Sequence, residues 1–176
     1  SAFSNHVVLV LNPRAVDYPV DVQRTSITKM TAALLGTTLE SMQLWDILRA
    51  VDFLVDGEGL KLDGISVYGR GLMGGLALHA AARDPRITRV ILDNPPASHW
   101  QGPALLHVLR YTDLPEVAAL MAPREIVSLT PLPESYRVTR SVYRLLGKPG
   151  AIRQADSLAE ALRVWEYGPV RAASKD

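Results

Sequence analysis

Apolar segments of strand length alternate with segments of helical spacing about five times along this chain. The predicted strands cover residues 7–11, 65–68, 87–92, 124–130 and 151–154. Alternation of this kind predicts an α/β fold in which helices cover a mostly parallel sheet through right-handed crossovers. We therefore expect a three-layer α/β/α architecture in a single domain over residues 1–176, a length that one hydrophobic core can serve.

The intervening helices are predicted from apolar residues that recur on one helical face. They cover residues 25–39, 39–55, 72–83, 102–110, 114–121, 136–146 and 157–167. The last of these begins with a capping signature, Ser157 followed three residues later by Glu160.

Residues 7–11, Val-Val-Leu-Val-Leu, form a continuous apolar run that predicts a strand buried on both faces. Natural domains seldom begin with an interior strand. The run therefore raises the alternative that residues 1–176 are the C-terminal part of a longer domain.

Composition removes several classes of function. The absence of cysteine excludes disulfide scaffolds, thiolate metal sites and a cysteine nucleophile. The net charge is +1 and the basic residues are dispersed, so we expect neither nucleic acid nor an anionic membrane as a partner. No apolar run approaches the roughly 20 residues of a spanning helix. The spacing of His, Asp and Glu predicts no metal site, and we expect no cofactor. The sequence does not determine the cellular compartment of the protein.

The densest glycine cluster, Tyr-Gly-Arg-Gly-Leu-Met-Gly-Gly at residues 68–75, lies between a predicted strand and a predicted helix. Ligands of parallel sheets bind at the carboxyl ends of the strands, so this turn is the main candidate for function. In one interpretation Gly69, Gly71 and Gly74 form the G-x-G-x-x-G fingerprint of a dinucleotide site, with Asp93 as the ribose-binding acid. Against this, the fingerprint normally opens the first strand of its domain.

A second interpretation is the strand-to-helix turn that exposes the catalytic serine of α/β hydrolases. Tyr68-Gly69-Arg70-Gly71 matches the approach to that turn, but Gly71 occupies the serine position. A hydrogen cannot attack a carbonyl, which excludes serine catalysis at this turn. In the third interpretation the glycines only let the helix pack tightly on the sheet.

Several spaced motifs together resemble the acetylxylan-esterase-like branch of the α/β-hydrolase superfamily. They are SMQLWDILRAVD at residues 41–52, YGRG at 68–71, DPRI at 84–87, LDNPPASH at 92–99, LPE at 114–116 and LMAPR at 120–124. The resemblance covers most of residues 7–167. It implies hydrolysis of a carboxylic ester, on an acylated carbohydrate or similar small ester.

The departures from this family leave a non-catalytic domain of the same fold as an alternative. The family places its acid after the seventh strand and its histidine after the eighth. Here residues 131–135 offer only Glu134, and residues 151–167 contain no histidine. All the histidines lie earlier in the chain, at His6, His79, His99 and His107.

The resemblance also makes residues 7–11 the family's fourth strand and leaves the third strand absent. Unpaired backbone groups at a buried sheet edge each cost about 1 to 3 kcal/mol. We therefore expect an upstream segment or a second chain to complete the sheet, or residues 7–11 to pair directly with residues 65–68.

A local cluster after the strand at 87–92 could supply acid, nucleophile and base as Asp93, Ser98 and His99. The interpretation that we favour is structural, with Asp93 capping the turn and His99 and Trp100 packing on it. Arg70 with Gly71 could bind an anion, but pairing of Arg70 with Asp93 is the favoured role. His79 is predicted to be a packing residue.

Overall fold

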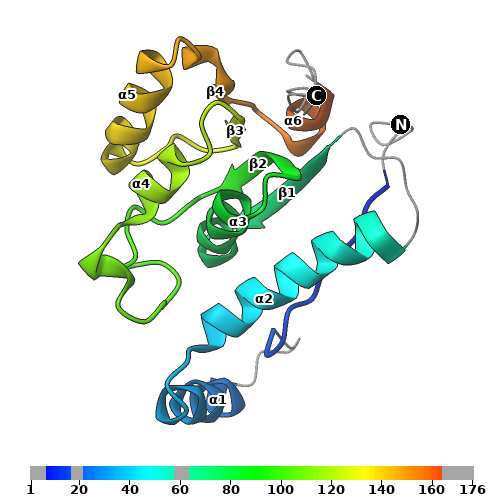
Figure 1. Cartoon of the computed structure of the whole chain (residues 1–176), viewed down its shortest axis with the longest axis vertical. Coiled ribbons are helices and arrows are strands. Elements are labelled where there is room, and N and C mark those ends of the chain that lie inside the picture. Colours follow the sequence, from blue (N-terminus) through cyan, green and yellow to red (C-terminus); the bar gives the residue numbers. More distant parts are fainter. Residues whose placement is uncertain (1–6, 17–21, 58–63, 164–176) are drawn as a thin grey trace, which may run out of the picture.

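The computed structural model describes residues 7–16, 22–57 and 64–163 (Figure 1). Its helices are α1 (Val22–Leu34), α2 (Leu39–Asp52), α3 (Leu72–Arg83), α4 (Leu114–Ala119), α5 (Arg137–Leu145) and α6 (Leu158–Arg163). Its strands are β1 (Ile65–Arg70), β2 (Ile87–Asp93), β3 (Glu125–Ser128) and β4 (Ile152–Gln154). A π-helical turn, Phe53–Gly57, follows α2.

The four strands form one parallel sheet in the order β1-β2-β3-β4. The predicted α/β fold with a parallel sheet is therefore confirmed. Because the strands are parallel, their carboxyl ends lie at one edge of the sheet. The register places Arg70 beside Asp93, and so brings the glycine turn next to the end of β2.

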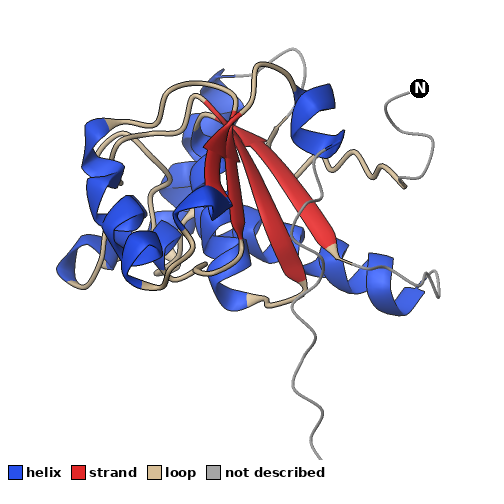
Figure 2. Cartoon of the chain, turned by 90° about the horizontal axis from the view of Figure 1, so that it is seen from above, coloured by secondary structure: helices blue, strands red, loops and turns tan. Residues whose placement is uncertain are grey.

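Helices lie on both faces of the sheet (Figure 2). Successive strand residues point to opposite faces. Val90 and Leu92 of β2 therefore join the large core formed with α2, α3, α4 and α5. Ile91 joins a smaller cluster that also contains Ala161 of α6. In the part of the chain that the structure describes, α6 is the helix that packs in this second cluster.

Two helix boundaries follow from capping. Thr38 and Ser41 form a capping box, in which each side chain bonds the other residue's backbone N–H, and α2 begins directly after Thr38. The backbone N–H of Glu160 donates to the Ser157 hydroxyl at 3.2 Å, as the sequence predicted for α6. Residues 164–167 of the predicted last helix lie outside the described residues.

Residues 7–11 do not form the predicted buried strand. They belong to none of the four strands, and Val7 and Val10 are 64% and 88% exposed. The contacts with α2 come after this segment, where the Arg14 guanidinium donates to the Asp46 carboxylate and Gln43 donates to the carbonyl of Arg14. The alternative of direct pairing with residues 65–68 is therefore wrong, because an apolar run becomes a strand only where a neighbour satisfies its backbone.

The edge of β1 that faces away from β2 carries no strand among the described residues. The expectation that an upstream segment or a second chain completes the sheet concerns this edge, and it stays a prediction.

The helix predicted at residues 102–110 is also wrong. This segment is a loop that ends in one short 3-10 turn, Val108–Arg110. Pro103 has no N–H to donate, and His107 adopts a positive φ of 59°, a conformation that an α-helix does not tolerate.

Candidate functional site

The turn between β1 and α3 places Gly71 in a conformation that few residues adopt. Its φ is 54° and its ψ is −125°, and it precedes the first residue of α3. The Gly71 N–H donates to the carbonyl of Asp93 at 2.8 Å, and the Gly71 carbonyl accepts from the Gly74 N–H at 2.9 Å. The chain therefore turns sharply from strand to helix and presents residue 71 at the carboxyl edge of the sheet, as in the turn that carries a hydrolase nucleophile.

The three glycines of the turn have different roles. A Cβ on Gly69 would lie 2.5 Å from the carbonyl oxygen of Met73, and a Cβ on Gly74 would lie 3.1 Å from the carbonyl oxygen of Gly69. These two glycines let β1 and α3 approach closely. A Cβ on Gly71 would meet no atom within 4 Å. The turn thus leaves space for a side chain at residue 71 but holds glycine there.

Asp93 is engaged by its neighbours on β1. The Tyr68 hydroxyl donates to the Asp93 carboxylate at 3.1 Å, and the Arg70 Nε lies 3.6 Å from the same oxygen. The predicted pairing of Arg70 with Asp93 is therefore confirmed. Burial raises the pKa of Tyr68, and the hydrogen bond and charge of Asp93 raise it further. Arg70 is largely exposed, so binding of an anion by Arg70 and Gly71 stays a prediction.

His99 and His79 form a buried pair. Their Nε2 atoms lie 2.9 Å apart, and the Nδ1 of His99 lies 2.8 Å from the carbonyl oxygen of Pro103. Because a carbonyl only accepts, Nδ1 of His99 donates to it, and the two Nε2 atoms share a hydrogen bond. Burial, together with the nearby His99 and Arg83, lowers the pKa of His79 to about 4. His79 is therefore a hydrogen-bonded core residue, in line with its predicted packing role.

Ser98 lies beside His99 in sequence but bonds elsewhere. Its hydroxyl accepts from the Trp100 N–H at 3.2 Å and contacts the Asp113 carboxylate. That carboxylate also accepts the His99 backbone N–H at 2.7 Å. Within the described ranges no hydrogen bond joins Asp93, Ser98 and His99 to one another. Their role as acid, nucleophile and base stays a hypothesis. Trp100 is 85% exposed and does not pack on the turn.

The His79 pair predicts a pH dependence of stability. His79 binds a proton below about pH 6.5 when the chain is unfolded, but only below about pH 4 when it is folded. The free energy of unfolding should therefore be highest above pH 6.5 and fall by about 3 kcal/mol as the pH decreases to 4. Urea unfolding across this range measures the slope.

Two variants separate His79 from other titrating groups. His79→Gln should flatten the slope between pH 4 and 6.5, whereas His107→Gln, at an exposed histidine, should leave it unchanged. An unaltered slope in His79→Gln would contradict this assignment.

Sequence reasoning did not identify the pairing of His79 with His99. The two residues lie on separate elements, a helix and a loop, and no short spacing joins them.

The described residues contain no cluster of three or more His, Asp or Glu side chains that could hold a metal ion. None of the helices described above is long and apolar enough to cross a membrane.

No protein-family model matches the sequence, and no curated protein matches it. A solved structure does match: a protein of Bacteroides fragilis described as a "putative acetyl xylan esterase", at a TM-score of 0.59 and 15% identity over 80% of this chain. The chain has an esterase-like α/β fold. The match spans 43% of the Bacteroides chain, and at this identity it concerns the fold alone.

Proposed function

We propose that this chain is a non-catalytic α/β-hydrolase-fold domain, which has the nucleophile turn of the fold without a nucleophile. The observation that carries the proposal is Gly71, which occupies the half-buried position of a sharp strand-to-helix turn with a positive φ that glycine adopts readily. Nucleophilic catalysis needs an oxygen or sulfur at this point and a base within hydrogen-bond reach.

The contacts of the other candidate groups support the same proposal. Both ring nitrogens of His99 are used, one by Pro103 and one by His79. Asp93 is bonded to Tyr68 and paired with Arg70 rather than with a histidine. Glu134, the acid nearest the family's acid position, is exposed on a short 3-10 turn.

Carboxylic-ester hydrolysis is the second candidate, favoured by the description of the Bacteroides fragilis structure. If the chain hydrolyses esters, an acetylxylan-esterase-like reaction on a small ester or acylated carbohydrate would use Ser98 as nucleophile, His99 as base and Asp93 as acid. The hydrogen bonds around these residues would have to rearrange before His99 could accept a proton from a serine.

Hydrolysis of p-nitrophenyl acetate and of acetylated xylo-oligosaccharides distinguishes the two candidates. We expect the wild-type chain to show no turnover above the buffer rate, and Ser98→Ala and His99→Ala to behave identically to it. Turnover that His99→Ala abolishes would contradict the proposal and support the esterase.

The dinucleotide site remains the third interpretation of the glycine turn. It requires the backbone at Gly69, Gly71 and Gly74 to approach a pyrophosphate and Asp93 to accept from a ribose. Asp93 is already engaged by Tyr68 and Arg70, which weighs against it. Fluorescence of NADH should be unchanged when millimolar cofactor is mixed with the protein.

A further inference from the structure

A cavity of about 330 Å³ lies between α2, the end of α3 and the loop after Pro103, away from the glycine turn. Three side chains of α2 line it on one side, Leu44, Trp45 and Leu48. Leu105 and Leu106 of the loop line the other side. Pockets that bind small molecules begin at about this volume and are mostly apolar with a few polar groups.

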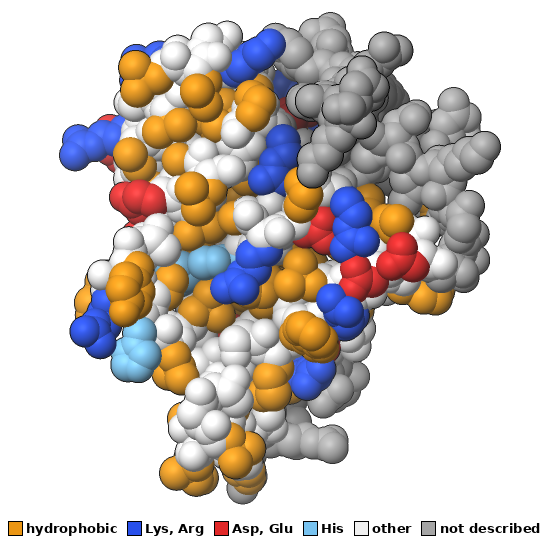
Figure 3. Space-filling model, in the orientation of Figure 1, with side chains coloured by type: hydrophobic (Ala, Val, Ile, Leu, Met, Phe, Trp, Pro, Cys, Tyr) orange, Lys and Arg blue, Asp and Glu red, His pale blue; other side chains and the backbone are white. Residues whose placement is uncertain are grey.

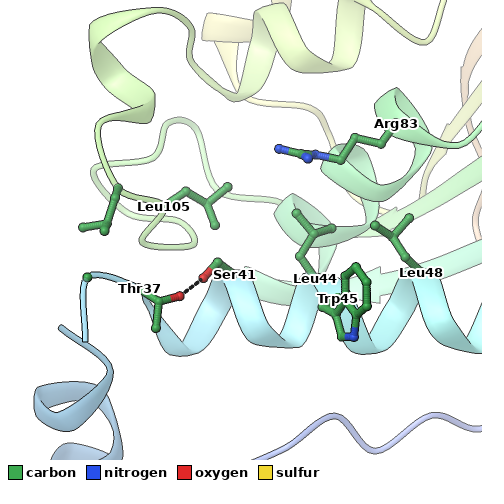
Figure 4. Close-up of a pocket in the computed structure, with 9 residues that line it drawn as sticks. Thr37, Ser41, Leu44, Trp45, Leu48, Arg83 and Leu105 are labelled. Carbon is green, nitrogen blue, oxygen red and sulfur yellow. Dashed lines mark hydrogen bonds between the residues drawn. The ribbon is translucent and has the colours of Figure 1, made fainter. Parts of the chain in front are cut away.

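Arg83, the last residue of α3, also lines this cavity. Figure 4 shows its guanidinium extending over Leu44 and Leu48, toward the side on which Leu105 lies. The hydroxyls of Thr37 and Ser41 also line the cavity and are bonded to each other at 2.9 Å within the cap of α2. The lining of the cavity therefore combines one cationic side chain, that of Arg83, with apolar side chains and hydroxyl groups.

The charge of Arg83 has no counterpart among the described residues. Six described arginines pair with a carboxylate, namely Arg14, Arg49, Arg70, Arg86, Arg89 and Arg153, whereas Arg83, which is exposed, shares the lack of such a partner with Arg110. For Arg83 the described part of the chain provides neither an ion pair nor a hydrogen bond. On the face shown in Figure 3, Lys and Arg side chains are scattered among hydrophobic patches. A guanidinium presents its donors in a planar fork that fits a carboxylate with two parallel hydrogen bonds.

We propose that this cavity binds a carboxylate that carries a short apolar chain. The carboxylate would lie on the Arg83 guanidinium, and the chain would lie between the leucines of α2 and those of the loop. Burial of the apolar chain would favour binding, and the charged hydrogen bonds would fix the orientation of the ligand. The proposal does not depend on whether the domain hydrolyses esters, because it uses none of the residues of the glycine turn.

Titration calorimetry with sodium octanoate tests the proposal. Wild-type protein should bind octanoate in a saturable manner at millimolar concentration. Arg83→Gln should weaken this binding about tenfold, because a charged hydrogen-bonded pair is lost. Octan-1-ol, with the same chain and no charge, should also bind about tenfold more weakly than octanoate.

Two controls keep the result interpretable. Arg110→Gln removes an exposed arginine that does not line the cavity and should leave octanoate affinity unchanged. Circular dichroism should show that both variants unfold at the wild-type temperature.

In amide NMR spectra, octanoate should shift signals of residues 36–48 and 83 and of the loop at 105–106.

Three results on affinity would overturn the proposal. They are no saturable binding of octanoate to the wild type, equal affinity in wild type and Arg83→Gln, and equal affinity for octanoate and octan-1-ol. Shifts confined to residues outside the cavity would overturn it as well.

Discussion

Gly69→Ala is expected to destabilise the domain by about 3 kcal/mol or to prevent it from folding. The added Cβ would lie 2.5 Å from the carbonyl oxygen and 2.6 Å from the carbonyl carbon of Met73, and 2.7 Å from the N atom of Gly74. All three are backbone atoms, so relief requires α3 to move away from β1. Overpacking of this kind costs about 1 to 3 kcal/mol, and more where the backbone must shift. Urea unfolding followed by circular dichroism measures the loss.

Gly36→Ala is the matched control for this prediction. Gly36 has a φ of 71° but open space around its Cβ position, so alanine there meets conformational strain without a collision. Its cost should stay near 1 to 2 kcal/mol, the usual penalty of a left-handed conformation for a residue other than glycine. A Gly69→Ala variant as stable as Gly36→Ala would show that the close contact of β1 and α3 is not as described.

Glu125→Gln is expected to cost about 3 kcal/mol or more. The Glu125 carboxylate accepts from the Nε of Arg89 at 2.5 Å and from the Nε of Arg153 at 2.8 Å. The Arg89 side chain is only 3% exposed, and it also donates to the carbonyl of Ala161 in α6. The neutral amide would leave the buried Arg89 charge without this carboxylate, and breaking one partner of a buried pair is strongly destabilising.

Asp46→Asn provides the comparison for a more exposed pair. Asp46 accepts from Arg14, whose side chain is 48% exposed, so water replaces much of the interaction when the charge is removed. We expect a loss below about 1 kcal/mol in the same unfolding experiment. Similar losses in Glu125→Gln and Asp46→Asn would contradict the view that the Glu125 network holds β2, β3 and β4 to α6.

Local patterns in the sequence were sufficient for the elements that sit inside the sheet and its main core. The strands β1 and β2 and helix α3 lie where alternation and apolar content predicted them, because each is buried by neighbours that come next in the chain. The pairing of Arg70 with Asp93 was predictable for the same reason, since adjacent parallel strands place their last residues side by side.

The errors occurred where a distant partner decides the structure. Residues 7–11 have the composition of a buried strand, but a strand forms only beside another strand, and the described sheet places none there. At residues 102–110 the apolar spacing favoured a helix. The loop is held instead by the hydrogen bonds of His99 with His79 and with the Pro103 carbonyl, which sequence spacing does not reveal.

The candidate site was predictable in position but not in chemistry. The glycine cluster indicated a tight turn at the carboxyl edge of the sheet, and Gly71 already excluded a serine nucleophile there. The engagement of Asp93 by Tyr68 and the pairing of His99 with His79 depend on three-dimensional packing, so the sequence left Asp93, Ser98 and His99 open as a catalytic set.

We propose that this esterase-like α/β domain lacks an activated nucleophile, and covalent labelling tests this proposal most directly. A fluorophosphonate reacts with serines whose hydroxyl is activated by a base, and intact-protein mass spectrometry detects the adduct. We predict that the wild-type chain keeps its unmodified mass after prolonged incubation with the reagent. A single stoichiometric adduct on one serine, lost in the His99→Ala variant, would contradict the account.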